Sequence, residues 1–273
     1  MAQLAIKFWG VRGSIPSPGA STVKFGGNTS CVEVRSGSDV CVFDLGSGLR
    51  ELGVSLGRTP AKASMFLSHY HWDHIQGLPF FGPAYNPGSQ LDLYGPVREG
   101  RDVRSLLSGQ MVAPYFPVTI DAFRAKLGFH TISSGQTVHV GALRVTASEL
   151  HHPNGVLAYR IELGSKSVVY ATDTEHGTKA DEALVALAKD AEALIYDAMY
   201  TDDEYTQSKV GWGHSTWSAG IKLCEKAGCK RLVLFHHEPL RHDSDLEALL
   251  KDAAGDKGAV KVLVAREGEQ HEF

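Results

Sequence analysis

Short apolar runs, each bounded by glycine, proline or polar residues, recur along the whole chain. Most of them have the length and the content of β-branched and aromatic residues that are typical of strands. Segments with helical spacing separate several runs, at 45–56, 98–107, 181–189, 216–227 and 243–252. We therefore expect strands at 4–9, 31–35, 40–44, 63–68, 91–95, 128–132, 136–140, 143–150, 156–163, 167–171, 193–197, 231–235 and 260–264.

Side chains that bind metal ions follow four of these apolar runs. The densest group is His69-Tyr70-His71-Trp72-Asp73-His74, directly after 63–68, and the others begin at His152, Asp173 and His236. A single histidine or aspartate at a strand end usually bonds within the core or caps a turn. Four such strand ends are better explained together, as zinc-type imidazole and carboxylate ligands.

The first group also has the right spacing for a shared ion. His69 and His71 are two residues apart, so their side chains point to the same side of an extended segment. Gly77 and Pro79 limit any helix after His74 to about two turns. Asp73 and His74 lie beyond the turn that follows the extended segment, and we expect them to face a second ion.

Length and charge narrow the class of protein. With 273 residues, 43% of them hydrophobic, the chain can bury a large core, and we expect a single domain over 1–273. Its 27 basic and 31 acidic residues give a net charge of -4, which supplies no broad cationic field for duplex nucleic acid. A small substrate is favoured over a duplex.

Apolar segments and cysteine spacing predict the cellular compartment of the protein. No basic segment followed by an apolar core opens the chain, and no stretch approaches the roughly 18 apolar residues of a membrane helix, so we expect a soluble, cytoplasmic protein without a membrane partner. Cys31, Cys41, Cys224 and Cys229 lack Cys-x-x-Cys spacing and are expected to be buried free thiols.

The His-x-His-x-Asp-His run, with the later histidines and aspartate at strand ends, resembles the metallo-β-lactamase fold superfamily over nearly the whole chain. This resemblance implies an α/β fold, a four-layer αββα sandwich in which two mixed sheets are flanked by helices. Several motifs resemble the phosphodiesterase branch, which includes ribonuclease Z, cyclic-nucleotide phosphodiesterases and the cyclic phosphodiesterase of phosphonate breakdown. These motifs are 26–31, 71–79, 152–162, 172–175 and 213–216.

The resemblance also implies a ligand set for two divalent metal ions. One ion is expected at His69, His71 and His152, the other at Asp73, His74 and His236, with Asp173 bridging them. Histidine at position 71 favours zinc, with manganese or mixed occupancy as alternatives. His151 could replace His152, and His237 could replace His236.

Four residues have expected supporting or catalytic roles, and the resemblance implies the positions of two of them, Asp44 and His214. Asp44 matches an aspartate that orients a ligand histidine from behind, although it could equally cap a helix over 45–56. His214 matches a histidine near the scissile phosphate; hydrogen-bonded to a carboxylate such as Glu175, it could stabilise charge and protonate the leaving oxygen. Asp73 could also help to remove a proton from the bridging water.

The expected function is that of a dinuclear-metal hydrolase that cleaves the phosphodiester bond of a small, cyclic nucleotide by attack of a metal-bridging hydroxide. A tRNA 3′-processing endoribonuclease is the alternative, although no basic, glycine-rich arm is visible. A ligand-binding sensor with little turnover is a third hypothesis, and β-lactamase or thioesterase activity ranks lower.

Two features of the expected substrate site stay open. Aromatic residues could stack on a base or simply pack in the core: Phe80, Phe81, Tyr85, Tyr115, Phe116, Tyr200 and Trp212. The segment from Met111 to Phe116, broken by two prolines, could form a lid or the contact of a homodimer.

Overall fold

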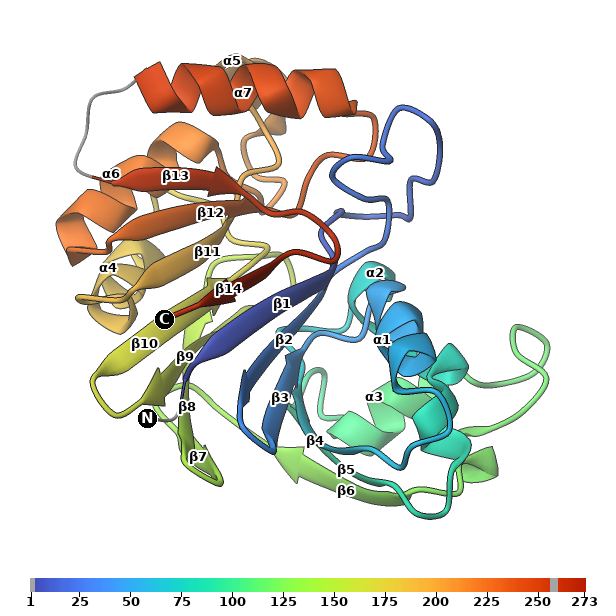
Figure 1. Ribbon diagram of the computed structural model, residues 1–273. Coiled ribbons are helices and arrows are strands. Elements are labelled where there is room, and N and C mark those ends of the chain that lie inside the picture. The colour runs from blue at the N-terminus through green and yellow to red at the C-terminus, as the bar shows by residue number, and fades with distance from the viewer. Residues whose placement is uncertain (1–2, 256–259) are drawn as a thin grey trace.

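In the computed structural model, which describes residues 3–255 and 260–273, two mixed sheets of seven strands face each other (Figure 1). The first sheet has the order β14-β1-β2-β3-β4-β5-β6. Its antiparallel part runs from β14 to β3, and its parallel part runs from β3 to β6. The strands are β1 (Ala5–Gly10), β2 (Cys31–Ser36), β3 (Asp39–Phe43), β4 (Lys62–Phe66), β5 (Gln90–Gly95), β6 (Lys126–Thr131) and β14 (Gln270–Glu272).

The second sheet has the order β13-β12-β11-β10-β9-β8-β7. Strands β10 to β13 are parallel, whereas β7 to β10 are antiparallel neighbours. The bounds are β7 (Thr137–Val140), β8 (Leu143–Leu150), β9 (Val156–Leu163), β10 (Lys166–Ala171), β11 (Ala193–Asp197), β12 (Arg231–Phe235) and β13 (Lys261–Val264).

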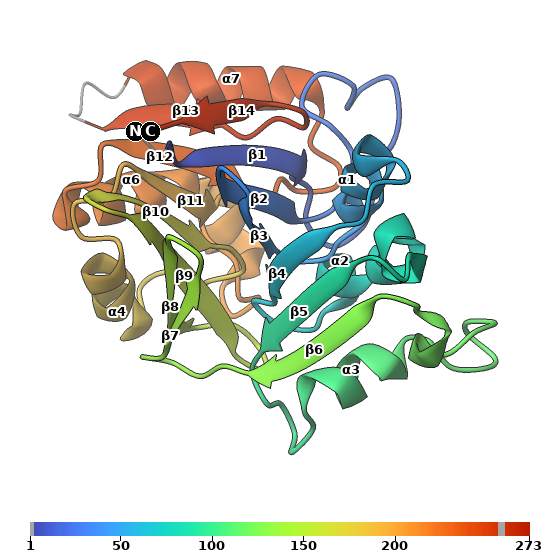
Figure 2. The same ribbon diagram turned by 60° about the horizontal axis from the view of Figure 1, so that its bottom comes forward.

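Helices cover the outer face of each sheet, which gives the four layers that the resemblance to the metallo-β-lactamase fold implies (Figures 1 and 2). The first sheet carries α1 (Gly48–Leu56), α2 (Trp72–Ile75) and α3 (Val103–Gly109), and the second carries α4 (Ala180–Leu187), α6 (Trp217–Ala227) and α7 (Asp243–Gly255). Shorter pieces are η1 (Leu78–Phe80), η2 (Gly82–Tyr85), η3 (Ile120–Ala122), α5 (Asp202–Glu204) and the π-helical η4 (Tyr205–Lys209).

The core between the sheets is built on aromatic contacts. Phe43 of β3 stacks on Phe66 of β4, with ring centroids 5.3 Å apart, and both rings contact Tyr159 of β9. All three side chains are fully buried. Two further clusters fill the spaces between each sheet and its helices, so the sheets are apolar on both faces.

Some element bounds differ from the expectations for local reasons. The helix expected at 98–107 begins at Val103, because the Asp102 side chain accepts a hydrogen bond from Ser105 N and Arg98 pairs with Arg101 in a tight turn. Strand β14 was not predicted. The four cysteines are buried and free, as expected. In the part of the chain that the structure describes, no helix is both long and apolar enough to span a membrane.

Candidate metal centre

The predicted ligands all follow strands whose ends meet at one edge of the two facing sheets. The connection after β4 runs into α2 and carries four of them, while β8, β10 and β12 each lead to one more. The structure brings together His69, His71, Asp73, His74, His152, Asp173 and His236. Carboxyl ends of parallel strands are the usual place for sites in such sheets.

The first set consists of three imidazoles and one carboxylate. His71 Nδ1 lies 2.9 Å from His69 Nε2 and 3.2 Å from His152 Nε2. Oδ2 of Asp173 lies 3.7 and 3.8 Å from the same two Nε2 atoms. Three imidazoles with a carboxylate form a donor set that suits zinc.

The second set shares Asp173 but uses its other oxygen. Oδ1 of Asp173 lies 3.2 Å from His74 Nε2 and 3.1 Å from His236 Nε2. Asp73 Oδ2 lies 3.2 and 3.3 Å from the same nitrogens. Asp173 therefore divides its two oxygens between the two sets, as a bridging carboxylate does.

Two observations test whether these residues fit metal ions. The ligand atoms of each set lie within 4.8 Å of one another. Among the residues that the structure describes, His74 Nε2 is buried and has no hydrogen-bond partner, although two carboxylate oxygens lie close to it. A buried polar atom without a partner is costly. A cation in contact with both carboxylates and both imidazoles would satisfy all of these atoms, so the residues fit the group.

Protonation favours the same interpretation. Burial holds the pKa of His69 and of His71 below the ordinary range and lowers that of His152 to about 4. These rings are therefore neutral near pH 7, which metal ligation requires. Burial also lowers the pKa of His74, but Asp173, Asp73 and Asp44 outweigh it and raise that pKa. This excess of negative charge is what a cation would neutralise.

Hydrogen bonds behind the ligands fix their orientation. Nδ1 of His74 lies 2.8 Å from Asp44 Oδ2, and the same oxygen accepts from Ser68 Oγ and from the Tyr170 hydroxyl. Asp44 thus supports a histidine and does not cap α1, whose N-cap is Ser47. Nδ1 of His152 donates to the Gly213 carbonyl at 2.7 Å, which leaves Nε2 free for an ion.

The backbone is strained where three of these residues lie. Asp44, Asp173 and His236 have φ values of 59°, 50° and 60°, which residues with a Cβ rarely adopt. Such strain persists only where the surroundings enforce it, and it is typical of functional sites.

A loop near the N-terminus forms one wall of the site, which the sequence patterns did not indicate. Ser14 N–H donates to Asp73 Oδ2 at 2.8 Å, and Gly13 packs against the His236 ring. Arg12, which is fully buried, holds this loop to the one after β12 by donating to the carbonyls of Glu238 and Arg241. Burial lowers the pKa of this guanidinium.

His214 lies beside the second set, but its carboxylate partner differs from the one expected. Nδ1 of His214 lies 2.8 Å from Asp197 Oδ2, and its ring stacks on His236 with centroids 5.1 Å apart. Glu175 instead accepts hydrogen bonds from Gly211 N, Gly213 N and the Tyr205 hydroxyl. The pairing of His214 with Glu175 was wrong, because these backbone donors occupy both carboxylate oxygens.

Asp197 was not singled out from the sequence. It ends an expected strand, so the pattern that identified the ligands, a carboxylate or imidazole at the end of an apolar run, also applies to it. Burial lowers the pKa of His214, but the charge of Asp197 and the hydrogen bond to it outweigh this and raise the pKa to about 9. The alternatives at the two histidine pairs lie elsewhere: His151 is exposed, and His237 bonds the Ala265 carbonyl.

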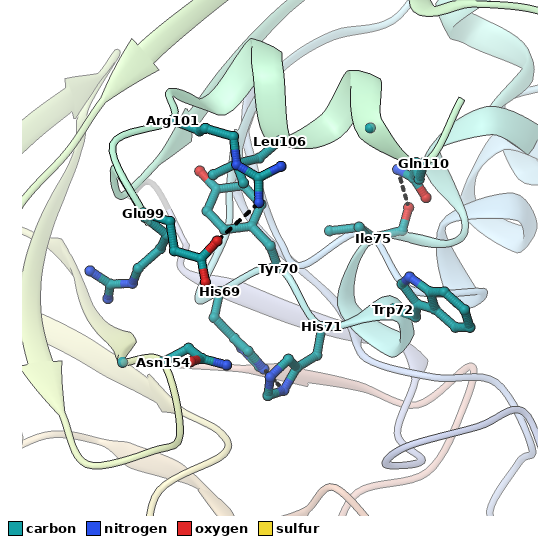
Figure 3. A pocket seen from close by; sticks show the side chains of 13 residues that line it. His69, Tyr70, His71, Trp72, Ile75, Glu99, Arg101, Leu106, Gln110 and Asn154 are labelled. Carbon is teal, nitrogen blue, oxygen red and sulfur yellow. Dashed lines mark hydrogen bonds and ion pairs between the residues drawn. The ribbon is translucent and has the colours of Figure 1, made fainter. Parts of the chain in front are cut away.

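A cleft of about 350 Å³ opens beside His69 and His71 (Figure 3). Its aromatic lining is Tyr70 and Trp72, and the seven aromatic residues proposed from the sequence do not line it. Phe81 is buried in the core under the first sheet, whereas Tyr115 is 84% exposed outside the cleft. Within the segment 111–116, Met111 is fully buried, and its role as a lid or dimer contact stays a prediction.

Comparison with known proteins places the chain among similar folds. Residues 41–237 match the family model described as beta-lactamase superfamily domain. A ribonuclease Z of Myxococcus xanthus is 25% identical, over 86% of this chain and 89% of the relative. The probable metallo-hydrolase YhfI of Bacillus subtilis is 27% identical, over 79% and 85%. The crystal structure of YhfI has a TM-score of 0.76 at 22% identity, over the whole of both chains.

These findings confirm the resemblance and the fold predicted from the sequence. The names of the relatives agree with the predicted class of enzyme, a metal-dependent hydrolase.

Gly13→Ala should weaken metal binding without unfolding the protein. The added Cβ would lie 2.5 Å from His236 Cε1 and from Met199 Cε, and the imidazole must shift. We expect metal affinity to fall by about 10- to 100-fold, as when the support of a ligand is removed. Titration against a chelator measures it. Gly82→Ala is the control, because its Cβ would meet no atom within 4 Å. Equal affinity in the two variants would contradict the packing role of Gly13.

Proposed function

The chain belongs to the beta-lactamase superfamily, and we propose that it is a phosphodiesterase that uses two divalent metal ions, zinc in the first place, to cleave a small cyclic nucleotide. The observation that carries this proposal is the division of Asp173 between two ligand sets, with His214 beside the second. Two cations, one at each ligand set, would suit a phosphodiester, which offers two non-bridging oxygens. When bound, such ions lower the pKa of water and neutralise charge on the phosphate.

The residues of the chain have separate tasks in this proposal. The histidines and aspartates of the two sets would hold the ions. Asp44 and the Gly213 carbonyl fix the rings of His74 and His152, so little reorganisation is needed during the reaction. Asp73, one oxygen of which accepts from Ser14 N, can also take up a proton from water.

His214 is placed to act as the acid. Asp197 holds its Nδ1, which directs Nε2 away from that carboxylate and keeps the ring protonated. A protonated imidazole next to the ligand sets can donate to the oxygen of the leaving group. Glu175 contributes through the loop that it anchors, which carries Gly213 and, next to it, His214.

The charge of the chain and the volume of the cleft both favour a small substrate. A net charge of -4 disfavours a long nucleic-acid backbone, and a cleft of about 350 Å³ suits a small ligand. The name of the Myxococcus xanthus relative supports a second candidate, tRNA 3′-end processing.

A substrate panel tests the function. Protein freed of metal and reconstituted with zinc or manganese should hydrolyse bis-p-nitrophenyl phosphate and a cyclic mononucleotide, and should leave a β-lactam intact. Faster cleavage of a tRNA precursor would favour the second candidate. Tight nucleotide binding without turnover of any diester, at full metal occupancy, would instead support a sensor and contradict the proposal.

Removing the acid and removing the bridge should have different effects. His214→Ala should lower kcat by about 10²- to 10⁴-fold, the usual contribution of a positioned acid, with metal content unchanged. Asp173→Ala should lose metal as well, because both sets contain this residue. Metal analysis alongside steady-state kinetics separates the two. Wild-type turnover in His214→Ala would remove this histidine from the mechanism.

The contact between Asp197 and His214 predicts how kcat depends on pH. Asp197 raises the pKa of His214, so Asp197→Asn should lower it. An acid is lost as pH rises through its pKa, and the alkaline limb of the kcat profile should therefore move to lower pH. Glu175→Gln, which does not touch His214, is the matched variant and should leave that limb in place. If the limb moved in Glu175→Gln but not in Asp197→Asn, Glu175 and not Asp197 would be the carboxylate that sets the pKa of His214.

A further inference from the structure

The cleft beside the first ligand set is lined in part by two of its ligands, His69 and His71. Its walls come from the start of α2, from α3, from the turn at 98–101 and from the loop at 154–155 (Figure 3). His69 and His71 line the cleft, so this space is open to the rest of a molecule whose phosphate lies at these ligands. The volume falls within the range of small-molecule sites.

Trp72 is the feature that identifies the kind of ligand. Its side chain is 80% exposed, although it lies between two predicted ligands and at the start of a helix whose other residues are mostly buried. It belongs to none of the three core clusters described above. An exposed indole at the edge of a cleft is a platform on which a planar ring can stack.

Two polar side chains lie at the α3 side of the cleft, an amide with a fixed direction and a guanidinium in a weak ion pair. Gln110 Nε2 donates to the Ile75 carbonyl at 3.1 Å, which fixes the amide and leaves its oxygen as an acceptor. Arg101 uses one terminal nitrogen in a 3.3 Å contact with Glu99, and both side chains are more than half exposed. Such an exposed ion pair is weak, so the guanidinium can turn to a ligand.

We propose that this cleft binds the nucleobase of the substrate, with Trp72 stacked on the face of the base and Arg101 and Gln110 at its edge. The inference rests on the proposed function only for the phosphate at the ligand sets. An aromatic face with one acceptor and one fork of donors matches a base, which has a planar ring and both kinds of group at its edge.

Binding of two phosphate monoesters tests the inference without turnover. Adenosine 5′-monophosphate carries a base and ribose 5-phosphate lacks one, and calorimetry on metal-free and zinc-loaded protein gives a Kd for each. We expect the nucleotide to bind at least about 10-fold more tightly, as stacking of one base on an aromatic residue suggests. Trp72→Ala should abolish most of this preference, and Trp72→Phe should restore part of it. Because this side chain is exposed, neither variant should unfold.

Arg101, which lies in the turn before α3, has a matched control on that helix. Arg104 is 52% exposed and pairs with Asp121, much as Arg101, 54% exposed, pairs with Glu99, but Arg104 does not line the cleft. Arg101→Gln should weaken nucleotide binding several-fold, and Arg104→Gln should not.

The outcomes separate this inference from the proposed function. Equal affinity for the two monoesters, or a preference unchanged in both Trp72→Ala and Arg101→Gln, would overturn the nucleobase site. Methyl p-nitrophenyl phosphate, a diester without a base, tests the chemistry alone. If the metal-loaded protein cleaves neither this diester nor a cyclic mononucleotide while the preference for the nucleotide persists, the proposed function fails and the nucleobase site stands.

Discussion

The organisation of this protein depends on two carboxylates, Asp73 and Asp173, that are buried among histidines. Unpaired charges in a protein interior are unfavourable, and here neither aspartate has a lysine or arginine as its partner among the ion pairs of the described residues. Two of the imidazoles around them, His69 and His152, are neutral because burial lowers their pKa, and so they do not balance the charge. Cations are the natural way to balance such a cluster, and this balance requires ligands from both halves of the chain.

The two facing sheets bring these ligands from both halves of the chain together. Parallel strands in each sheet end at the same edge, so one short connection after each strand is enough to place a ligand there. Three residues in the connections have positive φ, which shows that the site is held in place against local backbone preference. The aromatic core between the sheets supplies the rigidity, because the buried Tyr170 that contacts Phe43 also bonds the carboxylate of Asp44.

Much of this could be predicted from the sequence, and the limits have physical causes. The bounds of β8, β9, β11 and β12 agree with the expected runs, because β8 alternates apolar and polar residues and the other three are largely apolar, both of which are strand patterns. Strand β14 has only three residues, all polar, and carries no such signal. The sandwich itself followed from the resemblance and not from periodicity. The Arg12–Ser14 wall depends on contacts between distant segments, which residue spacing does not reveal. Asp197, by contrast, ends an apolar run, as the ligands follow theirs, and was overlooked.

The Arg12 side chain joins the two ends of the chain, since its bond to the Arg241 carbonyl connects residues 229 positions apart. Ribosomal synthesis proceeds from the N-terminus, and domains begin to fold in that order. The first ligand set is complete in sequence at Asp173, whereas the second must wait for His236 and for the loop that Arg12 secures. The nascent chain therefore acquires its two ligand sets one after the other, and the second closes only after His236 and Arg241 have been synthesised.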